Sequence, residues 1–150
     1  MKLCHNIKAS VFCKEDEDKE EMKQILTSLF PFDLEKEKII IKEQKASGFN
    51  EKIIIIYEIL LEKDRHINSF LESLNKNLSQ EHKEMILNQI SSRLNKGLDF
   101  YIRLDKEKLK NKELKITDEG NCIHLRLNIA AFPKKKEKAE EIIRKIFKLN

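Results

Sequence analysis

The stretch Leu98-Asp99-Phe100-Tyr101-Ile102-Arg103-Leu104-Asp105 alternates between apolar and polar side chains along its whole length. A period of two is typical of a β-strand with one buried side and one open side. The apolar residues would face a core, and Asp99, Tyr101 and Arg103 would face away from it. The stretch therefore predicts a sheet with one packed face and one free face.

The flanking segments extend this pattern in both directions. Alternation predicts further strands over residues 2–13, 38–46, 52–62 and 122–132, and a short strand around residues 114–116. Ser47-Gly48-Phe49-Asn50 is predicted to form the hairpin connection between the second and third strands. Helical spacing of apolar residues predicts four helices: after the acidic run at residues 15–18, over residues 67–78, from residue 79 to Gly97, and over residues 139–147.

The resulting order is β-α-β-β-α-α-β-β-β-α, which predicts an α+β fold of two layers. We expect a mostly antiparallel sheet with amphipathic helices on one face. A chain of 150 residues without a linker-like segment is expected to form a single domain, residues 1–150. The open face would carry the polar residues of several strands, namely Lys8, Ser10, Lys42, Gln44, Tyr101, Arg103, His124, Arg126 and Asn128.

Composition excludes several classes of protein. The chain is 40% hydrophobic and has three glycines and two prolines, so a disordered or collagen-like chain is not expected. Its longest apolar run, Ile53–Leu61, is interrupted by Glu58 and is shorter than the roughly 20 residues that a membrane-spanning helix needs. The start of the chain lacks the apolar core of a secretory signal, which favours a cytoplasmic protein without a membrane partner. The abundance of Lys and Glu is typical of thermophile proteins, or of an AT-rich genome.

No motif for catalysis or metal binding is present in the sequence. There is no glycine-rich phosphate loop and no pair of closely spaced cysteines. His5 falls on the apolar side of its strand and His124 on the polar side of its own strand, so no metal ligand set is expected. Glu58 and Glu62 share one side of a strand, but balancing nearby lysines is the simpler role for them. We therefore expect no cofactor and no enzymatic activity.

Charge is unevenly distributed along the chain. The net charge is +4, and residues 101–150 carry 14 basic against 8 acidic residues. A basic segment favours a polyanionic partner such as RNA, whose phosphates bind Lys and Arg and whose unpaired bases stack on aromatic rings. The candidate RNA-binding residues are Lys8, Tyr101, Arg103, Arg126, Lys134, Lys135 and Lys136. The alternative is a solvated face with cross-strand ion pairs.

The segment Phe100-Tyr101-Ile102-Arg103-Leu104-Asp105-Lys106, followed by Glu113-Leu114 and Cys122-Ile123-His124-Leu125-Arg126-Leu127, resembles an archaeal family of small RNA-binding proteins. The hallmark of that family is an Arg-x-Asp-Lys run at the end of a strand, and its members are described as predicted exosome-associated subunits. Asn6-Ile7, Glu15-Asp16-Glu17 and Ser91-Ser92-Arg93-Leu94 also fit the family pattern, whereas Glu107 stands where the family has Gln. The resemblance implies a fold like that of ribosomal protein L5.

The resemblance also implies roles for individual residues. Arg103 and Lys106 are the expected RNA contacts, and Asp105 is expected to orient Arg103 or to cap the following turn. A structural role for this motif, tying the strand end to the helix that ends at Arg93, is the alternative. The expected function is RNA binding in RNA processing or degradation, with exosome subunits as partners. The alternative is a protein-interaction subunit, a homodimer or a part of a larger assembly, since Ile53–Leu61 is apolar on both sides over four residues.

Overall fold

The computed structural model describes residues 2–47, 50 and 52–149. Their five strands form one antiparallel sheet in the order β2-β3-β1-β5-β4. The strands are β1 (Cys4–Cys13), β2 (Lys42–Ser47), β3 (Ile53–Leu61), β4 (Asp99–Asp105) and β5 (Cys122–Ile129). The helices are α1 (Lys19–Thr27), α2 (Asp64–Asn77), α3 (Gln80–Asn88), α4 (Ile90–Arg93), α5 (Lys106–Lys110) and α6 (Lys136–Ile146). The predicted α+β class, with its antiparallel sheet, is confirmed.

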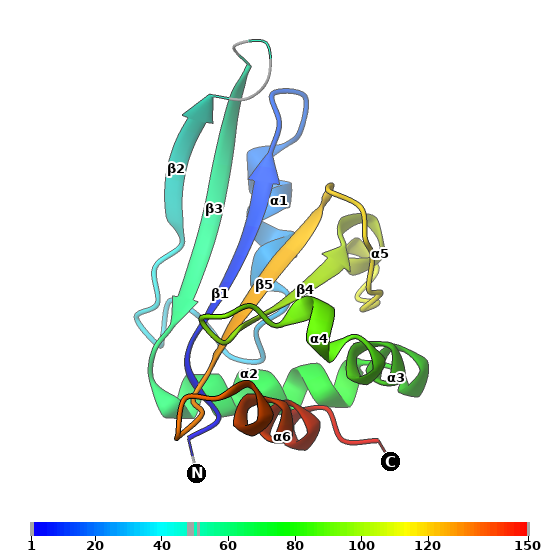
Figure 1. Cartoon of the computed structure of the whole chain (residues 1–150). Coiled ribbons are helices and arrows are strands. Elements are labelled where there is room, and N and C mark those ends of the chain that lie inside the picture. Colours follow the sequence, from blue (N-terminus) through cyan, green and yellow to red (C-terminus); the bar gives the residue numbers. More distant parts are fainter. Residues whose placement is uncertain (1, 48–49, 51, 150) are drawn as a thin grey trace.

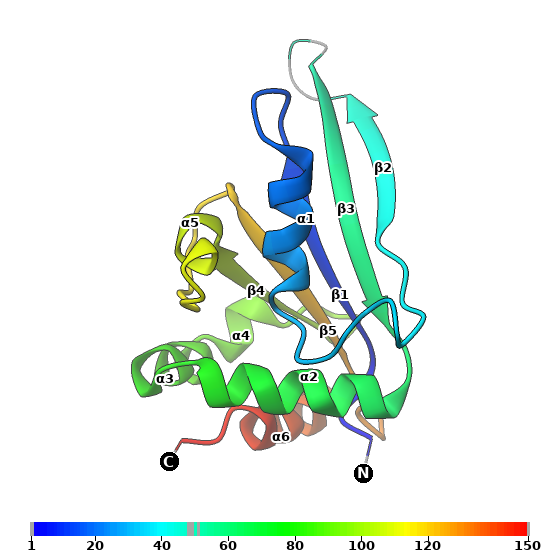
Figure 2. The same ribbon diagram turned by 180° about the vertical axis from the view of Figure 1, so that it is seen from behind.

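The helices leave one face of the sheet open. Figure 2 shows α1 and α2 across one face, and Figure 1 shows the opposite face, on which neither helix lies. Helices α3 and α6 lie at the end of the sheet where β1 begins, and Phe147 after α6 packs against Phe100 with ring centroids 6.2 Å apart. The covered face forms the core with side chains from the four longest strands, including Ile7, Ala9, Val11, Tyr57, Ile59, Phe100, Ile102, Leu104, Ile123, Leu125 and Leu127.

Local chemistry explains where α1 begins. The Asp18 side chain accepts hydrogen bonds from the backbone N–H groups of Glu20 and Glu21, which would otherwise lack partners in the first turn. The acidic residues of that turn also lie at the positive end of the helix dipole. The apolar residues Met22, Ile25 and Leu26 then fall on the side that packs on the sheet.

Four local predictions differ from the structure. Strand β2 begins at Lys42 rather than at residue 38, because a turn with Lys38 in the left-handed region (φ 59°) precedes it. The short strand expected at residues 114–116 is reduced to one bridge between Leu104 and Ile116. The helix predicted from residue 79 to Gly97 breaks at Gln89, which separates α3 from α4. The charged turn after β4 contains the short helix α5.

The two edges of the sheet differ. The hairpin between β2 and β3 is confirmed by the pairing of Ser47 with Ile53, although Gly48 and Phe49 of its connection lie outside the described residues. Strand β2 forms one edge and is mostly exposed. The outer edge of β4 is covered by the chain on either side of it, which donates hydrogen bonds to three of its carbonyl groups (Asn95 N to Asp99 O at 3.0 Å, Arg93 Nη1 to Tyr101 O at 3.2 Å, Thr117 N to Arg103 O at 3.0 Å).

Candidate nucleic-acid interface

Polar side chains of three neighbouring strands lie together on the open face. Cross-strand register places Tyr101 opposite Arg126 and Arg126 opposite Lys8, so the three form one row across β4, β5 and β1. The next row joins Arg103 of β4 to His124 of β5. Neighbours in such a row have Cβ atoms about 4.5–5.5 Å apart. We call Lys8, Tyr101, Arg103, His124 and Arg126 the polar patch.

Two cations of the polar patch are paired with carboxylates. Lys8 Nζ lies 3.7 Å from a carboxylate oxygen of Glu58, and Arg126 Nε lies 3.8 Å from Asp99 Oδ1. Arg126 also donates to Asn6 Oδ1 at 3.2 Å. These pairs are the cross-strand ion pairs that the alternative interpretation expected, and they reduce the charge that each cation offers to a ligand.

Arg103, unlike Lys8 and Arg126, is not paired with a carboxylate among the described residues. Its Nη1 donates to the backbone carbonyl of Asp118 at 3.1 Å, and no carboxylate lies within 4 Å of its guanidinium among the described residues. The side chain is exposed, so its positive charge faces solvent on the open side of the sheet. A planar guanidinium in that position can bind a phosphate or stack on a base.

Tyr101 adds an aromatic surface to the polar patch. Its side chain is 44% exposed, and its hydroxyl accepts a hydrogen bond from Asn95 Nδ2 at 3.3 Å. The hydroxyl is therefore held at the strand edge while the ring remains accessible. An exposed ring beside cations is the combination on which unpaired nucleic-acid bases stack.

His124 lies between Arg103 and Ser10 and is largely shielded. Its ring packs against Phe12 with centroids 5.3 Å apart, and its Nε2 lies 3.6 Å from Cys122 Sγ. Burial lowers the pKa of His124 below the ordinary value of 6.5, and the positive charges of Arg103 and Lys106 lower it further. The imidazole is therefore neutral at neutral pH.

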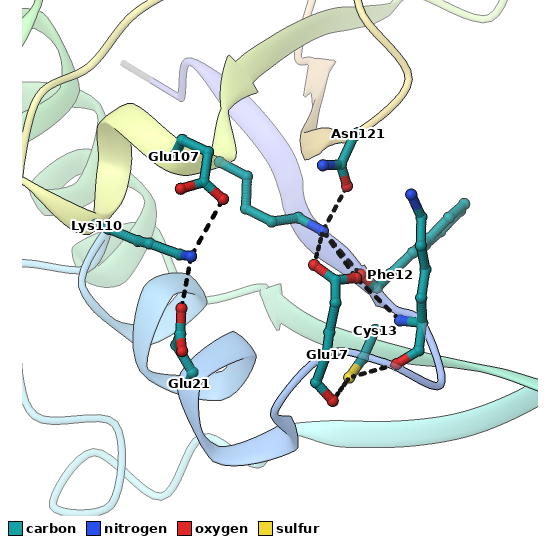
Figure 3. A network of polar contacts seen from close by, with 9 residues as sticks. Phe12, Cys13, Glu17, Glu21, Glu107, Lys110 and Asn121 are labelled. Carbon is teal, nitrogen blue, oxygen red and sulfur yellow. Dashed lines mark hydrogen bonds and ion pairs between the residues drawn. The ribbon is translucent and has the colours of Figure 1, made fainter.

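Lys106 does not lie on the open face, although the resemblance implied that it contacts RNA. The residue is 1% exposed. Its Nζ donates to Asn121 Oδ1 at 2.8 Å and to the Phe12 carbonyl at 3.1 Å, and it lies 3.3 Å from Glu17 Oε2 (Figure 3). Because a buried ammonium needs such partners, the geometry of the site holds the side chain inside the protein.

The other two positions linked to the motif make contacts that hold local structure. The Asp105 side chain accepts a hydrogen bond from Lys108 N at 2.9 Å and so caps α5, which is one of the two roles expected for it. Arg93 donates to Gln89 Oε1 from Nε at 3.0 Å and from Nη2 at 2.6 Å, and its Nη1 donates to the Tyr101 carbonyl. Arg93 therefore ties α4 to β4, but through backbone and amide oxygens rather than through Asp105.

The lysine run lies apart from the polar patch. Lys134 and Lys135 are exposed in the connection that leaves β5, and Lys136 begins α6. That connection lies at the end of β5 opposite to α5, close to the N-terminus in Figure 1. The exposed side chain of Phe132 precedes the run. The structure therefore joins Lys8, Tyr101, Arg103 and Arg126 in one place and does not add the lysine run to them.

Sequence reasoning missed a hollow beside this patch. It has a volume of about 460 Å³ and is lined by Gln89, Ser92, Arg93, Tyr101, Arg103 and Asp118. The helix α4 and the loop before β5 meet β4 only in the folded chain, so no spacing in the sequence indicates this hollow. One signal was available, since Ser91-Ser92-Arg93-Leu94 is among the segments that fit the family pattern.

Three further features of the described residues bear on what the protein can do. No group of three or more His, Cys, Asp or Glu side chains in residues 2–47, 50 and 52–149 is arranged to hold a metal ion. No helix in the same part of the chain combines the length and the apolar character needed to cross a bilayer. Burial raises the pKa of the Cys122 thiol, against the opposing charges of Arg103 and Lys106.

The fold and the polar patch together define an α+β protein that presents an aromatic ring and cations on a free sheet face. The chain belongs to the family whose model is described as RNA binding, which matches residues 6–129. Among its relatives, the RNA-binding protein PAB1135 of Pyrococcus abyssi is 29% identical over 140 residues, which are 93% of this chain and 91% of that protein. The uncharacterized protein MJ0213 of Methanocaldococcus jannaschii is 26% identical over 149 residues, which are 94% and 96% of the two chains.

Solved structures agree with the fold. Protein AF2318 from Archaeglobus fulgidus, of the DUF54 family model, has a TM-score of 0.86 at 28% identity, with 95% of this chain and 99% of that chain covered. Mth689, a DUF54 protein from Methanothermobacter thermautotrophicus, has a TM-score of 0.79 at 24% identity, with 97% and 99% covered. The relatives are archaeal proteins, as the resemblance implied. A fold like that of ribosomal protein L5 and an exosome association stay predictions.

Proposed function

We propose that this protein binds RNA through the polar patch on the open face of its sheet. The single observation that carries the proposal is the position of Arg103, an exposed guanidinium without a carboxylate partner among the described residues, next to the exposed ring of Tyr101. Arg103 supplies phosphate contact and Tyr101 supplies stacking. Membership of the RNA-binding family supports the same function.

Lys8 and Arg126, which lie in the same row as Tyr101, contribute further cations. Both are already paired, with Glu58 and Asp99 respectively, so a phosphate must compete with a carboxylate for each of them. Both pairs are part-exposed and long, which makes them weak. We therefore expect these two residues to add less to RNA affinity than Arg103 does.

The test compares two substitutions that remove the same charge. Arg103→Ala should weaken binding of fluorescent RNA by about tenfold or more, because it removes a charged contact. It should also reduce the slope of log affinity against log salt concentration by about one, the value expected for the loss of one phosphate contact. Arg144→Ala is the matched control, since Arg144 is exposed on α6 and pairs with Glu140 within its own helix. An equal loss of affinity in both variants, or no RNA binding by the wild type, would refute the proposal.

The proposed cellular role is an accessory function in RNA processing or degradation. Its support is the resemblance of the Arg103-to-Lys106 segment to a family described as exosome-associated. If the protein delivers RNA to a degrading complex, wild-type protein should speed the decay of labelled RNA by a purified archaeal exosome. The Arg103→Ala variant should not do so, and equal rates with and without wild-type protein would count against this role.

The alternative, a homodimer, has one observation in its favour. The part of the open face formed by β3 carries three apolar side chains beside Glu58: Leu60 is 40% exposed, and Ile54 and Ile56 are half-buried. Phe12 on β1 is 40% exposed next to them. An apolar patch of this kind is typical of an interface. A solution mass of two chains, reduced to one chain by Ile56→Lys, is the result expected of a dimer that uses this surface.

A further inference from the structure

The hollow next to the polar patch has the volume of a ligand site. Its lining comes from three separate parts of the chain, namely α4 with the preceding residue Gln89, the middle of β4, and the loop before β5. Its volume of about 460 Å³ is in the range of roughly 300–1,000 Å³ that is usual for small-molecule sites. Of the Arg-x-Asp-Lys motif, only Arg103 lines it.

Two guanidinium groups line this hollow, and both are held by neutral acceptors. Arg93 is fixed by Gln89 Oε1 and by the Tyr101 carbonyl, and Arg103 is fixed by the Asp118 carbonyl. Neither guanidinium forms an ion pair with a carboxylate among the residues that the structure describes. Two guanidinium groups and one carboxylate, Asp118, line the hollow, which leaves an excess of positive charge that favours an anion, and a planar guanidinium matches a phosphate group in particular.

The direction of the pKa shift of Arg93 is consistent with a second guanidinium nearby. Burial lowers the pKa of its guanidinium, Asp118 acts in the opposite direction, and the positive charge of Arg103 lowers it again. The two guanidinium groups are thus close enough to repel each other. A bound phosphate would relieve that repulsion.

The rest of the lining fits a nucleotide better than a phosphate alone. Tyr101 offers an accessible ring for a base. Ser92 donates its hydroxyl to the Gln89 carbonyl at 3.1 Å, so its oxygen remains free to accept. The Asp118 carboxylate on an exposed loop is an acceptor for the hydroxyls of a ribose or for the N–H groups of a base. The lining therefore offers guanidinium groups for a phosphate, polar acceptors for a sugar and an aromatic ring for a base.

We propose that this hollow holds one unpaired nucleotide of a single-stranded RNA, with its phosphate on Arg93 and Arg103 and its base against Tyr101. The inference rests on the proposed function and specifies the class of RNA. In an A-form duplex the bases are stacked inside the helix, so a duplex cannot place a base in a hollow at a strand edge. Single-stranded RNA can turn a nucleotide outward at low cost.

The experiment uses two neighbouring serines of α4. Ser92 lines the hollow, and Ser91 is exposed on the same helix without lining it. Ser92→Glu places a carboxylate beside the two guanidinium groups, where it competes with the phosphate. Ser91→Glu makes the same change in net charge one residue away. The binding of both full-length variants to a short oligouridine and to a blunt-ended duplex of equal length is measured by fluorescence anisotropy.

We expect Ser92→Glu to lose affinity for oligouridine by about tenfold or more, and Ser91→Glu to lose less than about threefold. The duplex should bind the two variants equally. If both variants lose the same affinity, or if Ser92→Glu binds oligouridine as the wild type does, the inference is overturned while RNA binding by the patch stands. If the wild type binds neither RNA, the proposed function fails as well.

Discussion

Replacing Lys106 should destabilise the protein without removing its affinity for RNA. In Lys106→Met the side chain keeps its approximate length but loses its three donors. The change leaves Asn121 Oδ1, the Phe12 carbonyl and the Glu17 carboxylate without their shared partner. Removing one member of a buried ion pair costs about 3–5 kcal/mol. The lower end applies here, because the Glu17 side chain is 20% exposed and can regain water.

A loss of about 3 kcal/mol corresponds to a fall in melting temperature of roughly 6–12 °C for a chain of this size. Thermal unfolding followed by circular dichroism measures that shift. Lys108→Met is the matched control, since Lys108 lies two residues further on the same helix and is exposed, with its Nζ 3.9 Å from Glu113. That variant should melt within about 2 °C of the wild type, as weak surface pairs contribute little.

RNA affinity, measured well below the melting temperature, decides between the two roles of Lys106. We expect a change of no more than about threefold, because a buried ammonium makes no contact with a phosphate and acts only through its distant charge. A tenfold loss of RNA affinity in Lys106→Met, together with an unchanged melting temperature, would contradict the reasoning. It would mean that Lys106 leaves the core and contacts RNA directly.

Two predictions concern pH. A hydrogen bond from His66, together with the charge of Arg65, holds the pKa of Glu37 below 4.5. This carboxylate therefore stabilises the fold above pH 4.5, and the contribution is lost as pH falls through the lower folded value. Glu37→Gln should reduce the fall in melting temperature over about pH 3–5. A phosphate beside Arg103 should raise the pKa of His124, which burial, Arg103 and Lys106 lower in the free protein. RNA affinity should therefore increase as pH falls through the raised pKa of the bound state, and an anisotropy titration of His124→Gln should lose that increase.

The strands and their faces could be predicted from the sequence because a period of two is a local property. Tyr101, Arg103 and Arg126 fall on the open face because each alternates with core residues such as Ile102 and Leu125, which are fully shielded in the structure. Antiparallel pairing then brings the outward residues of neighbouring strands together without further information. The polar patch follows from the same pattern.

The burial of Lys106 could not be predicted in this way. The residue follows β4 directly and lies within a run of charged residues, which is usually a solvated turn. Its partners come from far along the chain: Phe12 and Glu17 are 94 and 89 residues away, and Asn121 is 15 residues away. The hollow is hidden from the sequence for the same reason, because α4 and the loop at Asp118 approach β4 only through tertiary contacts.

The three named residues of the Arg-x-Asp-Lys run therefore have three different roles in the structure. Arg103 lies on the open face near the end of β4, Asp105 caps α5, and Lys106, the first residue of α5, is buried. Lys106 holds Asn121, which lies in the same loop as Asp118, and the Asp118 carbonyl holds the Arg103 guanidinium at 3.1 Å. Lys106 can therefore affect RNA affinity only indirectly, by holding the loop whose Asp118 carbonyl positions Arg103. For this reason its loss should lower stability strongly and affinity weakly, whereas the loss of Arg103 should do the reverse.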